Sequence, residues 1–115
     1  MAVRSLAWLP DSATLLVACD DGFVSMYDAE HAALLDALPG HSGWVLSVAA
    51  SPDGACFATG GADASVRLWE SGTRTCAQVL SSEHSDLVWG LAFSPDGSRL
   101  ATGGDDKTLA LFGVS

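Results

Sequence analysis

The sequence predicts an all-β protein made of about two and three-quarter copies of one repeat. A proline-aspartate pair recurs at intervals of 42 and then 43 residues, at Pro10-Asp11, Pro52-Asp53 and Pro95-Asp96. An aspartate and an aromatic residue further along recur at the same intervals, at Asp21, Asp63 and Asp106 and at Tyr27, Trp69 and Phe112. Between these markers apolar residues alternate at period two, and no helical periodicity competes. The period therefore predicts adjacent units of a few short strands each.

Each repeat divides into strands at residues that favour turns. In the first repeat we expect strands over 3–8, 14–19, 23–27 and 33–38. In the second we expect 44–50, 55–60, 65–69 and 75–80, and in the third 87–93, 99–103 and 108–112. The segment 51–54 (Ser-Pro-Asp-Gly) has proline at its second and glycine at its fourth position, which suits a type I turn. Asp63 falls in the next tight turn, where its carboxylate can accept hydrogen bonds from the backbone.

The period in the low forties, with Gly40-His41 before a first strand and Trp69-Glu70 ending a third, resembles the WD-repeat β-propeller family. In that family each repeat forms one four-stranded blade of a ring. The resemblance implies blades over 1–39 and 40–82 and an incomplete blade over 83–115. Closed propellers have at least four blades, so we expect this incomplete propeller to be part of a longer chain, cut on its N-terminal side and genuine at its C-terminus.

The resemblance also implies a buried hydrogen-bonded tetrad in the blades. Its members would be His41, Thr59, Asp63 and Trp69 in the second repeat, and His84, Thr102 and Asp106 in the third, where Phe112 replaces tryptophan. A hydroxyl, an imidazole and a carboxylate are also the parts of a catalytic triad. Because the set recurs once per repeat, whereas a catalytic site is normally single, we interpret it as a structural network.

Two of the four tryptophans are expected at a partner-binding rim. Trp8 and Trp69 fall in core positions of the pattern, whereas Trp44 and Trp89 lie beside the regular valines that open the first strands. In propellers these positions surround the upper end of the central channel, and tryptophan is enriched among interface hot spots. Neighbouring positions complete the expected rim: Arg4, Leu46, Leu87, Asp20, Ala62 and Asp105. The alternative is that both tryptophan rings only fill gaps between blades.

Charge and composition argue against several classes of function. The chain has 14 acidic and 5 basic residues and a net charge of −9, and its basic residues are scattered singly, so no direct nucleic-acid binding is expected. The acidity either attracts basic partners or only maintains solubility. No apolar run approaches the ~20 residues that span a bilayer, so no membrane contact is expected. No phosphate-binding loop or metal-ligand spacing is present, so we expect no cofactor.

The three cysteines are expected to be reduced thiols packed in the core: Cys19, Cys56 and Cys76.

Residues outside the general repeat pattern resemble the closing blades of the WD-repeat subunits of the superkiller complex. They include 44–46 (Trp-Val-Leu), 72–76 (Gly-Thr-Arg-Thr-Cys) and 88–90 (Val-Trp-Gly), whereas Glu83 and Gly113 depart from that pattern. The resemblance implies a non-catalytic scaffold that binds a tetratricopeptide-repeat protein and helps hold an RNA helicase against the exosome for 3′-to-5′ mRNA decay. It also implies a role with the Paf transcription-elongation complex, and hence a location in the cytoplasm and nucleus.

Two alternatives remain open at this stage. Another WD-repeat adaptor, such as a ubiquitin-ligase substrate receptor, would share the fold and differ only in its partner. A propeller enzyme would need a polar cluster that occurs once, whereas the polar clusters found in this sequence are repeated.

Overall fold

The computed structural model describes residues 2–80 and 86–114, which form eleven strands in three sheets and no helix. The first sheet, blade 1, contains β1 (Val3–Trp8), β2 (Thr14–Cys19), β3 (Phe23–Asp28) and β4 (Ala33–Pro39). Blade 2 contains β5 (Val45–Ala50), β6 (Cys56–Gly61), β7 (Val66–Glu70) and β8 (Thr75–Leu80). Blade 3 contains β9 (Val88–Phe93), β10 (Arg99–Gly104) and β11 (Leu109–Gly113). Paired strands are antiparallel, and the expected all-β fold is confirmed.

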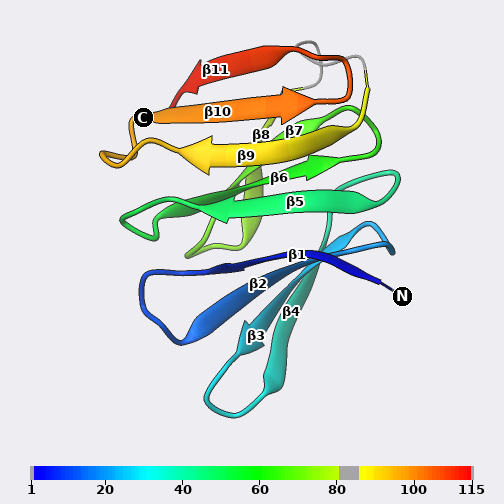
Figure 1. Ribbon diagram of the computed structural model, residues 1–115. Coiled ribbons are helices and arrows are strands. Elements are labelled where there is room, and N and C mark those ends of the chain that lie inside the picture. The colour runs from blue at the N-terminus through cyan, green and yellow to red at the C-terminus, as the bar shows by residue number, and fades with distance from the viewer. Residues whose placement is uncertain (1, 81–85, 115) are drawn as a thin grey trace.

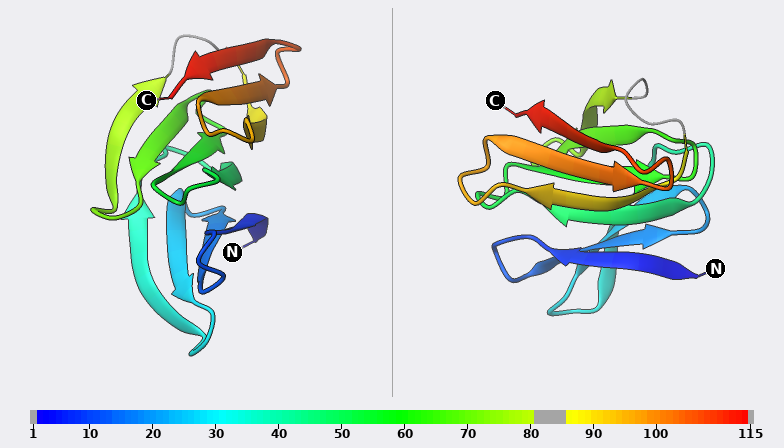
Figure 2. Two further views of the ribbon diagram at one scale, coloured as in Figure 1. Left: turned by 90° about the vertical axis from the view of Figure 1, so that its left-hand side faces the viewer. Right: turned by 45° about the horizontal axis from the view of Figure 1, so that its top comes forward.

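The three blades stand next to one another with their first strands along a shared inner edge (Figure 1). There β1 contacts β5, and β5 contacts β9. The outer strands β4 and β8 lie on the opposite side of the assembly (Figure 2). The arrangement is that of consecutive blades in an incomplete β-propeller, as the repeat period predicts.

Each blade-to-blade interface contains its own apolar cluster. Between blades 1 and 2 the buried members are Leu9, Leu16, Ala18, Val24, Met26, Leu38, Val45, Val48, Phe57 and Trp69. Between blades 2 and 3 they are Ala58, Val66, Val88 and Leu100. Because strand side chains alternate between faces, each blade contributes one set of residues to the preceding blade and another to the following blade. Each large side chain that is fully buried contributes about 1.5–3 kcal/mol.

The turn between the first two strands of each blade is closed by a hydrogen bond of the expected type. The amide of Gly54 donates to the carbonyl of Ser51 (3.0 Å), and the amide of Gly97 donates to Ser94 (2.8 Å). Both glycines have positive φ, at 74° and 76°, where a side chain is unfavourable. Ser12 occupies the same position in blade 1 with φ 56°, so this turn adopts a left-handed conformation without glycine.

The strand boundaries agree with the expected ones to within one residue, whereas the burial expected of Trp8 and Cys76 was wrong. Trp8, expected in the core, is 55% exposed, because no described segment covers the face of blade 1 that points away from blade 2. Cys76 is an exposed thiol on the outer strand β8, which no other strand among the described residues flanks on its outer side. Cys19 is buried and Cys56 is half-buried, and all three are free thiols.

Candidate functional site

The second blade brings the four predicted tetrad residues into one hydrogen-bonded chain. The indole Nε1 of Trp69 donates to Thr59 Oγ1 (3.1 Å), which lies 2.7 Å from His41 Nε2. On the other side of the ring, His41 Nδ1 lies 3.0 Å from a carboxylate oxygen of Asp63. Because Thr59 accepts from the indole, it donates its own proton to His41 Nε2, which leaves Nδ1–H to donate to Asp63. The network joins β6, β7, the turn between them and the segment that precedes β5.

The charges of this network follow from burial and from hydrogen bonding. Burial lowers the pKa of His41 below 6.5 and outweighs the opposite effect of Asp63, so the ring is neutral at pH 7. Burial also opposes ionisation of Asp63. Hydrogen bonds from Ser65, His41 and the Ser42 amide outweigh that effect and lower the pKa of this carboxyl to about 2. An ionised Asp63 therefore accepts several hydrogen bonds while His41 stays uncharged.

The tetrad has the atom order of a catalytic triad but not its access to substrate. Thr59 is 0% exposed and the side chain of His41 is 0% exposed, so neither can reach a substrate atom. The Trp69 indole also occupies an acceptor site on the threonine hydroxyl. This geometry supports a structural role, in which a satisfied buried network fixes the strands.

The third blade carries part of the same set. Thr102 is 1% exposed, and Asp106 accepts from the amide of Thr108 (3.0 Å) and from its hydroxyl (2.6 Å). Phe112 stands where blade 2 has Trp69, so it supplies no indole donor. His84 lies outside the described residues.

The predicted rim is built on an irregularity that all three inner strands share. The ladder register shifts between Val3 and Ser5 in β1 and between Val45 and Ser47 in β5. In β9 it shifts between Val88 and Gly90, which pair with Gly104 and Gly103 of β10. Each shift leaves one bulged residue: Arg4, Leu46 and Trp89. A bulge redirects its side chain out of the regular alternation.

Hydrogen bonds from the adjacent turns fix the residues that precede these bulges. The amide of Ala62 donates to the carbonyl of Trp44 (2.8 Å), and the amide of Asp105 donates to that of Leu87 (2.9 Å). In blade 1 the amide of Asp20 makes the equivalent bond to Ala2 (3.1 Å). The first-strand and turn positions expected at the rim are therefore adjacent in the structure.

An ion pair on blade 1 stacks over a tryptophan of blade 2. Arg4 Nε and Nη2 both donate to the carboxylate of Asp20, and the hydrogen bond from Arg4 holds the pKa of Asp20 below its usual value. The Arg4 guanidinium also lies 4.4 Å from the centre of the Trp44 ring. Such cation–π contacts contribute about 0.5–1 kcal/mol at exposed sites. Sequence reasoning selected these three residues but missed their pairing, since it depends on how one blade faces the next.

Exposure separates the rim residues into two groups. Trp44 and Trp89 are each 48% exposed, whereas Leu46 is 3% exposed. The prediction that Leu46 is available at the surface was wrong, because the middle blade has a neighbour on both sides. Leu87, Asp20 and Ala62 are half-buried and Asp105 is exposed. From here on, "the rim" means Arg4, Asp20, Trp44 and Trp89.

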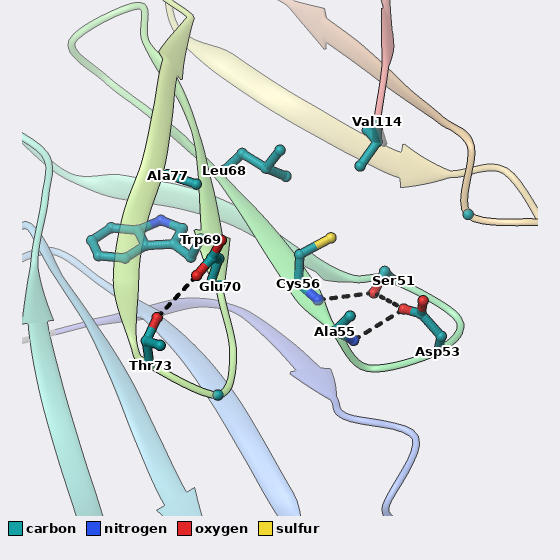
Figure 3. A pocket seen from close by; sticks show the side chains of 12 residues that line it. Ser51, Asp53, Ala55, Cys56, Leu68, Trp69, Glu70, Thr73, Ala77 and Val114 are labelled. Atoms are coloured by element: carbon teal, nitrogen blue, oxygen red, sulfur yellow. Dashed lines mark hydrogen bonds between the residues drawn. The ribbon is translucent and has the colours of Figure 1, made fainter.

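A pocket of about 490 Å³ lies between blades 2 and 3, at the C-terminal end of β5 and away from the rim (Figure 3). Leu68, Trp69, Cys56 and Val114 line it together with the turn that contains Asp53. The Asp53 carboxylate already accepts hydrogen bonds from Ser51 Oγ (2.7 Å) and the Ala55 amide (3.0 Å). These bonds assign Asp53 to the turn rather than to proton transfer.

Within residues 2–80 and 86–114, no group of three or more histidine, cysteine, aspartate or glutamate side chains is arranged to hold a metal ion. The same residues contain no helix long and apolar enough to cross a membrane.

Comparison with known protein families gives two matches. The family model described as "WD domain, G-beta repeat" matches residues 33–70 and 74–112. The model for the WD40 domain of anaphase-promoting complex subunit 4 matches residues 1–50. The first match covers more than half of the chain.

Individual relatives are diverse. Protein groucho of Drosophila melanogaster is 35% identical over 69 residues, which is 60% of this chain and 10% of that protein. The intraflagellar transport protein 122 homolog of Danio rerio is 39% identical over 69 residues, which is 60% of this chain and 6% of that protein. The superposition on the crystal structure of RRP9 WD40 repeats has a TM-score of 0.94 at 26% identity and includes 99% of this chain and 36% of that chain. The chain thus spans a tenth or less of the length of the groucho and intraflagellar transport proteins.

Proposed function

The chain belongs to the WD40 repeat family, whose members generally act as protein-interaction scaffolds, and from that premise we propose that it is a non-catalytic scaffold that binds a partner protein at the rim. The observation that carries the proposal is the position of Trp44, which lies next to the first strand of the middle blade and is still 48% exposed. Trp89, on the first strand of blade 3, is equally exposed, although no described blade follows it. Tryptophan dominates interface hot spots because it buries a large apolar area at little cost in conformational entropy.

The rim has features that suit a protein segment. Arg4 is hydrogen-bonded to Asp20, and its guanidinium stacks on the ring of Trp44. These contacts hold the aromatic ring in place before a partner binds. Preorganised groups lose less conformational entropy on binding. The scattered basic residues offer no continuous track for a nucleic-acid backbone, so any contact with RNA would be indirect.

The resemblance supports a specific partner set. We infer that the chain acts as a WD-repeat subunit of the superkiller complex, where it would bind a tetratricopeptide-repeat protein and hold an RNA helicase near the exosome. A second association with the Paf transcription-elongation complex would place the protein in both cytoplasm and nucleus. The residues that support this inference are 72–76 and 88–90, which lie outside the general repeat pattern.

Another adaptor role is the second candidate. The match of residues 1–50 to the WD40 domain of anaphase-promoting complex subunit 4 favours membership of a different multi-subunit complex. A ubiquitin-ligase substrate receptor is one such adaptor. The fold is the same in either case, so only the identity of the partner distinguishes them.

Affinity purification of the endogenous protein, followed by mass spectrometry, tests the partner set. Recovery of an RNA helicase together with a tetratricopeptide-repeat protein would support the superkiller assignment. Recovery of cullin-type proteins would replace it with the ligase role, and recovery of neither set would refute both.

Substitutions at the rim test the binding surface with the partner recovered in that experiment. We expect Trp44→Ala and Trp89→Ala each to weaken binding roughly thirtyfold, the effect of a hot spot of about 2 kcal/mol. Thermal stability should change little, because both rings are half exposed. Val79→Ala is the control, since Val79 is 46% exposed on the outer strand β8. Equal binding by all three variants would show that the partner docks elsewhere.

A further inference from the structure

An arginine of blade 1 shows which groups of this molecule can hold a guanidinium. Nε and Nη2 of Arg4 donate to the two carboxylate oxygens of Asp20, and the guanidinium lies 4.4 Å from the centre of the Trp44 ring. A carboxylate and an indole therefore hold this cation together. Both contacts are favourable for arginine, because two parallel hydrogen bonds match its planar fork and the ring face attracts its charge.

Blade 3 has the same backbone at the equivalent positions. The amide of Asp105 donates to the carbonyl of Leu87 (2.9 Å), which is the bond that fixes Asp20 in blade 1. Trp89 occupies the bulge that Arg4 occupies in blade 1. Blade 3 thus keeps the carboxylate beside the bulge, whereas an indole replaces the cation.

Neither of these two side chains is required to form this part of a blade. In blade 2 the position of Asp105 is taken by Ala62, whose amide still bonds to the residue that precedes the first strand (2.8 Å). The position of Trp89 is taken by Leu46, in a bulge of the same kind. The carboxylate and the indole of blade 3 are therefore available for a purpose other than folding.

Both groups are accessible from solvent. Trp89 is 48% exposed, and Asp105 is exposed. Within residues 2–80 and 86–114 the Asp105 carboxylate forms no hydrogen bond or ion pair, and this includes Lys107 in the same turn. The adjacent Asp106 differs, because it accepts from the hydroxyl of Thr108 (2.6 Å). The Asp105 carboxylate is thus free to bind a cation that comes from outside these residues.

We propose that the partner segment bound at the rim carries an arginine, whose guanidinium stacks on Trp89 and pairs with Asp105. This inference rests on the proposed function, because it names the chemistry of the segment that docks there. Arginine fits better than lysine, since only its planar fork can donate two parallel hydrogen bonds to one carboxylate and also stack on a ring, as Arg4 does. The net charge of −9 attracts a cationic segment before contact is made.

Titration with short peptides, followed by nuclear magnetic resonance, tests the proposal without the partner protein. The probes are capped peptides in which glycines flank one central arginine, lysine or citrulline, which resembles arginine in shape but is uncharged. We expect the arginine peptide to shift the indole signal of Trp89 and the amide signal of Asp105. The indole of Trp44 should not shift, because Arg4 already stacks on it. The lysine peptide should bind about threefold more weakly, and the citrulline peptide should not bind detectably.

Substitutions distinguish a specific pair from general attraction to an acidic protein. Asp105→Asn should weaken binding of the arginine peptide about fivefold, the upper end for an exposed ion pair. Trp89→Leu introduces the residue of blade 2 and should weaken it by a similar factor. The control Glu30→Gln removes one charge from an exposed residue that follows β3 in blade 1, and it should leave the affinity unchanged. All three positions are at least 48% exposed or lie among the exposed residues, so the circular dichroism spectra should not change.

Several outcomes would overturn the proposal. They are equal binding of the arginine and citrulline peptides, an unchanged affinity in Asp105→Asn, and a shift of Trp44 in place of Trp89.

Failure of this inference is distinguishable from failure of the proposed function. If Trp44→Ala and Trp89→Ala weaken binding of the recovered partner but the arginine peptide does not bind, the rim is the docking surface and the arginine is refuted. If the peptide binds at Trp89 but both variants bind the partner normally, the arginine site is supported and the proposed function fails.

Discussion

Replacing Thr59 by valine tests whether the tetrad of blade 2 stabilises the fold through hydrogen bonds or merely through packing. The substitution keeps the shape of the side chain and makes it more apolar. It removes the oxygen that accepts from Trp69 Nε1 at 3.1 Å and donates to His41 Nε2 at 2.7 Å. Because Thr59 is 0% exposed, water cannot replace either bond.

The expected cost follows from the groups left without partners. An unsatisfied buried donor or acceptor costs about 1–3 kcal/mol, so two of them lower the free energy of unfolding by about 2–6 kcal/mol. Domains of this size have about 5–15 kcal/mol in total, so the loss is large. Thr59→Ser keeps the hydroxyl and deletes one methyl group, which costs about 1 kcal/mol. Valine should therefore be worse than serine, although valine is the better packing match.

Urea unfolding at equilibrium, followed by far-ultraviolet circular dichroism, gives both free energies. Thr75→Val and Thr75→Ser are the matched controls, because Thr75 is exposed on β8 and should tolerate either change. If Thr59→Val proves as stable as Thr59→Ser or more so, then the network contributes through packing and our reasoning about the tetrad is wrong.

Three further predictions concern the same region and one turn. Gly61→Ala should lower the free energy of unfolding by about 1–3 kcal/mol, since an added Cβ would collide with the His41 ring, whereas Gly72→Ala meets no atom within 4 Å and should leave the urea midpoint unchanged. Because the pKa of His41 is lowered in the folded state, its stabilisation is complete well above pH 6.5 and is lost as pH falls through 6.5 toward the lower pKa of the folded protein, so the unfolding midpoint should drop as pH is lowered through 6.5. Protonation of Asp63 adds a loss only as pH falls from 3.8 through about 2, so a midpoint that is flat down to pH 4 would contradict the account of His41. Ser12→Gly should raise the melting temperature, with a gain of about 0.5–1 kcal/mol, because φ is 56° there, and an unchanged melting temperature would show that the serine turn is unstrained.

Local patterns in the sequence predicted much of the fold. Strand positions follow from the alternation of apolar residues between the Pro-Asp turns. Some strand ends differ from the expected ones by one residue, because a carbonyl such as that of Trp44 accepts a hydrogen bond from a turn amide instead of from a ladder partner. The tetrad residues of blade 2 could be assigned because the resemblance to the WD-repeat family implies them at these positions of the repeat. The stacking of Arg4 on Trp44 could not, because these residues belong to different blades and nothing in their spacing encodes the contact.

Burial is where sequence reasoning failed at particular residues. Trp8 and Leu46 both lie on inner strands, yet one is 55% and the other 3% exposed, opposite to what was expected of them. Their exposure depends on whether another blade stands beside them, which is a property of the assembly and not of the strand.

The sequence by itself determined the repeat, the order of strands and the residues that each strand turns to either face, because these depend on local backbone geometry and on a period of two. Only the tertiary structure decided which of those faces are covered, how the bulged residues of neighbouring blades meet, and which aromatic rings remain open to a partner. The physical reason is that burial and pairing between blades arise from contacts between segments some forty residues apart, and side-chain alternation within one blade leaves those contacts unspecified.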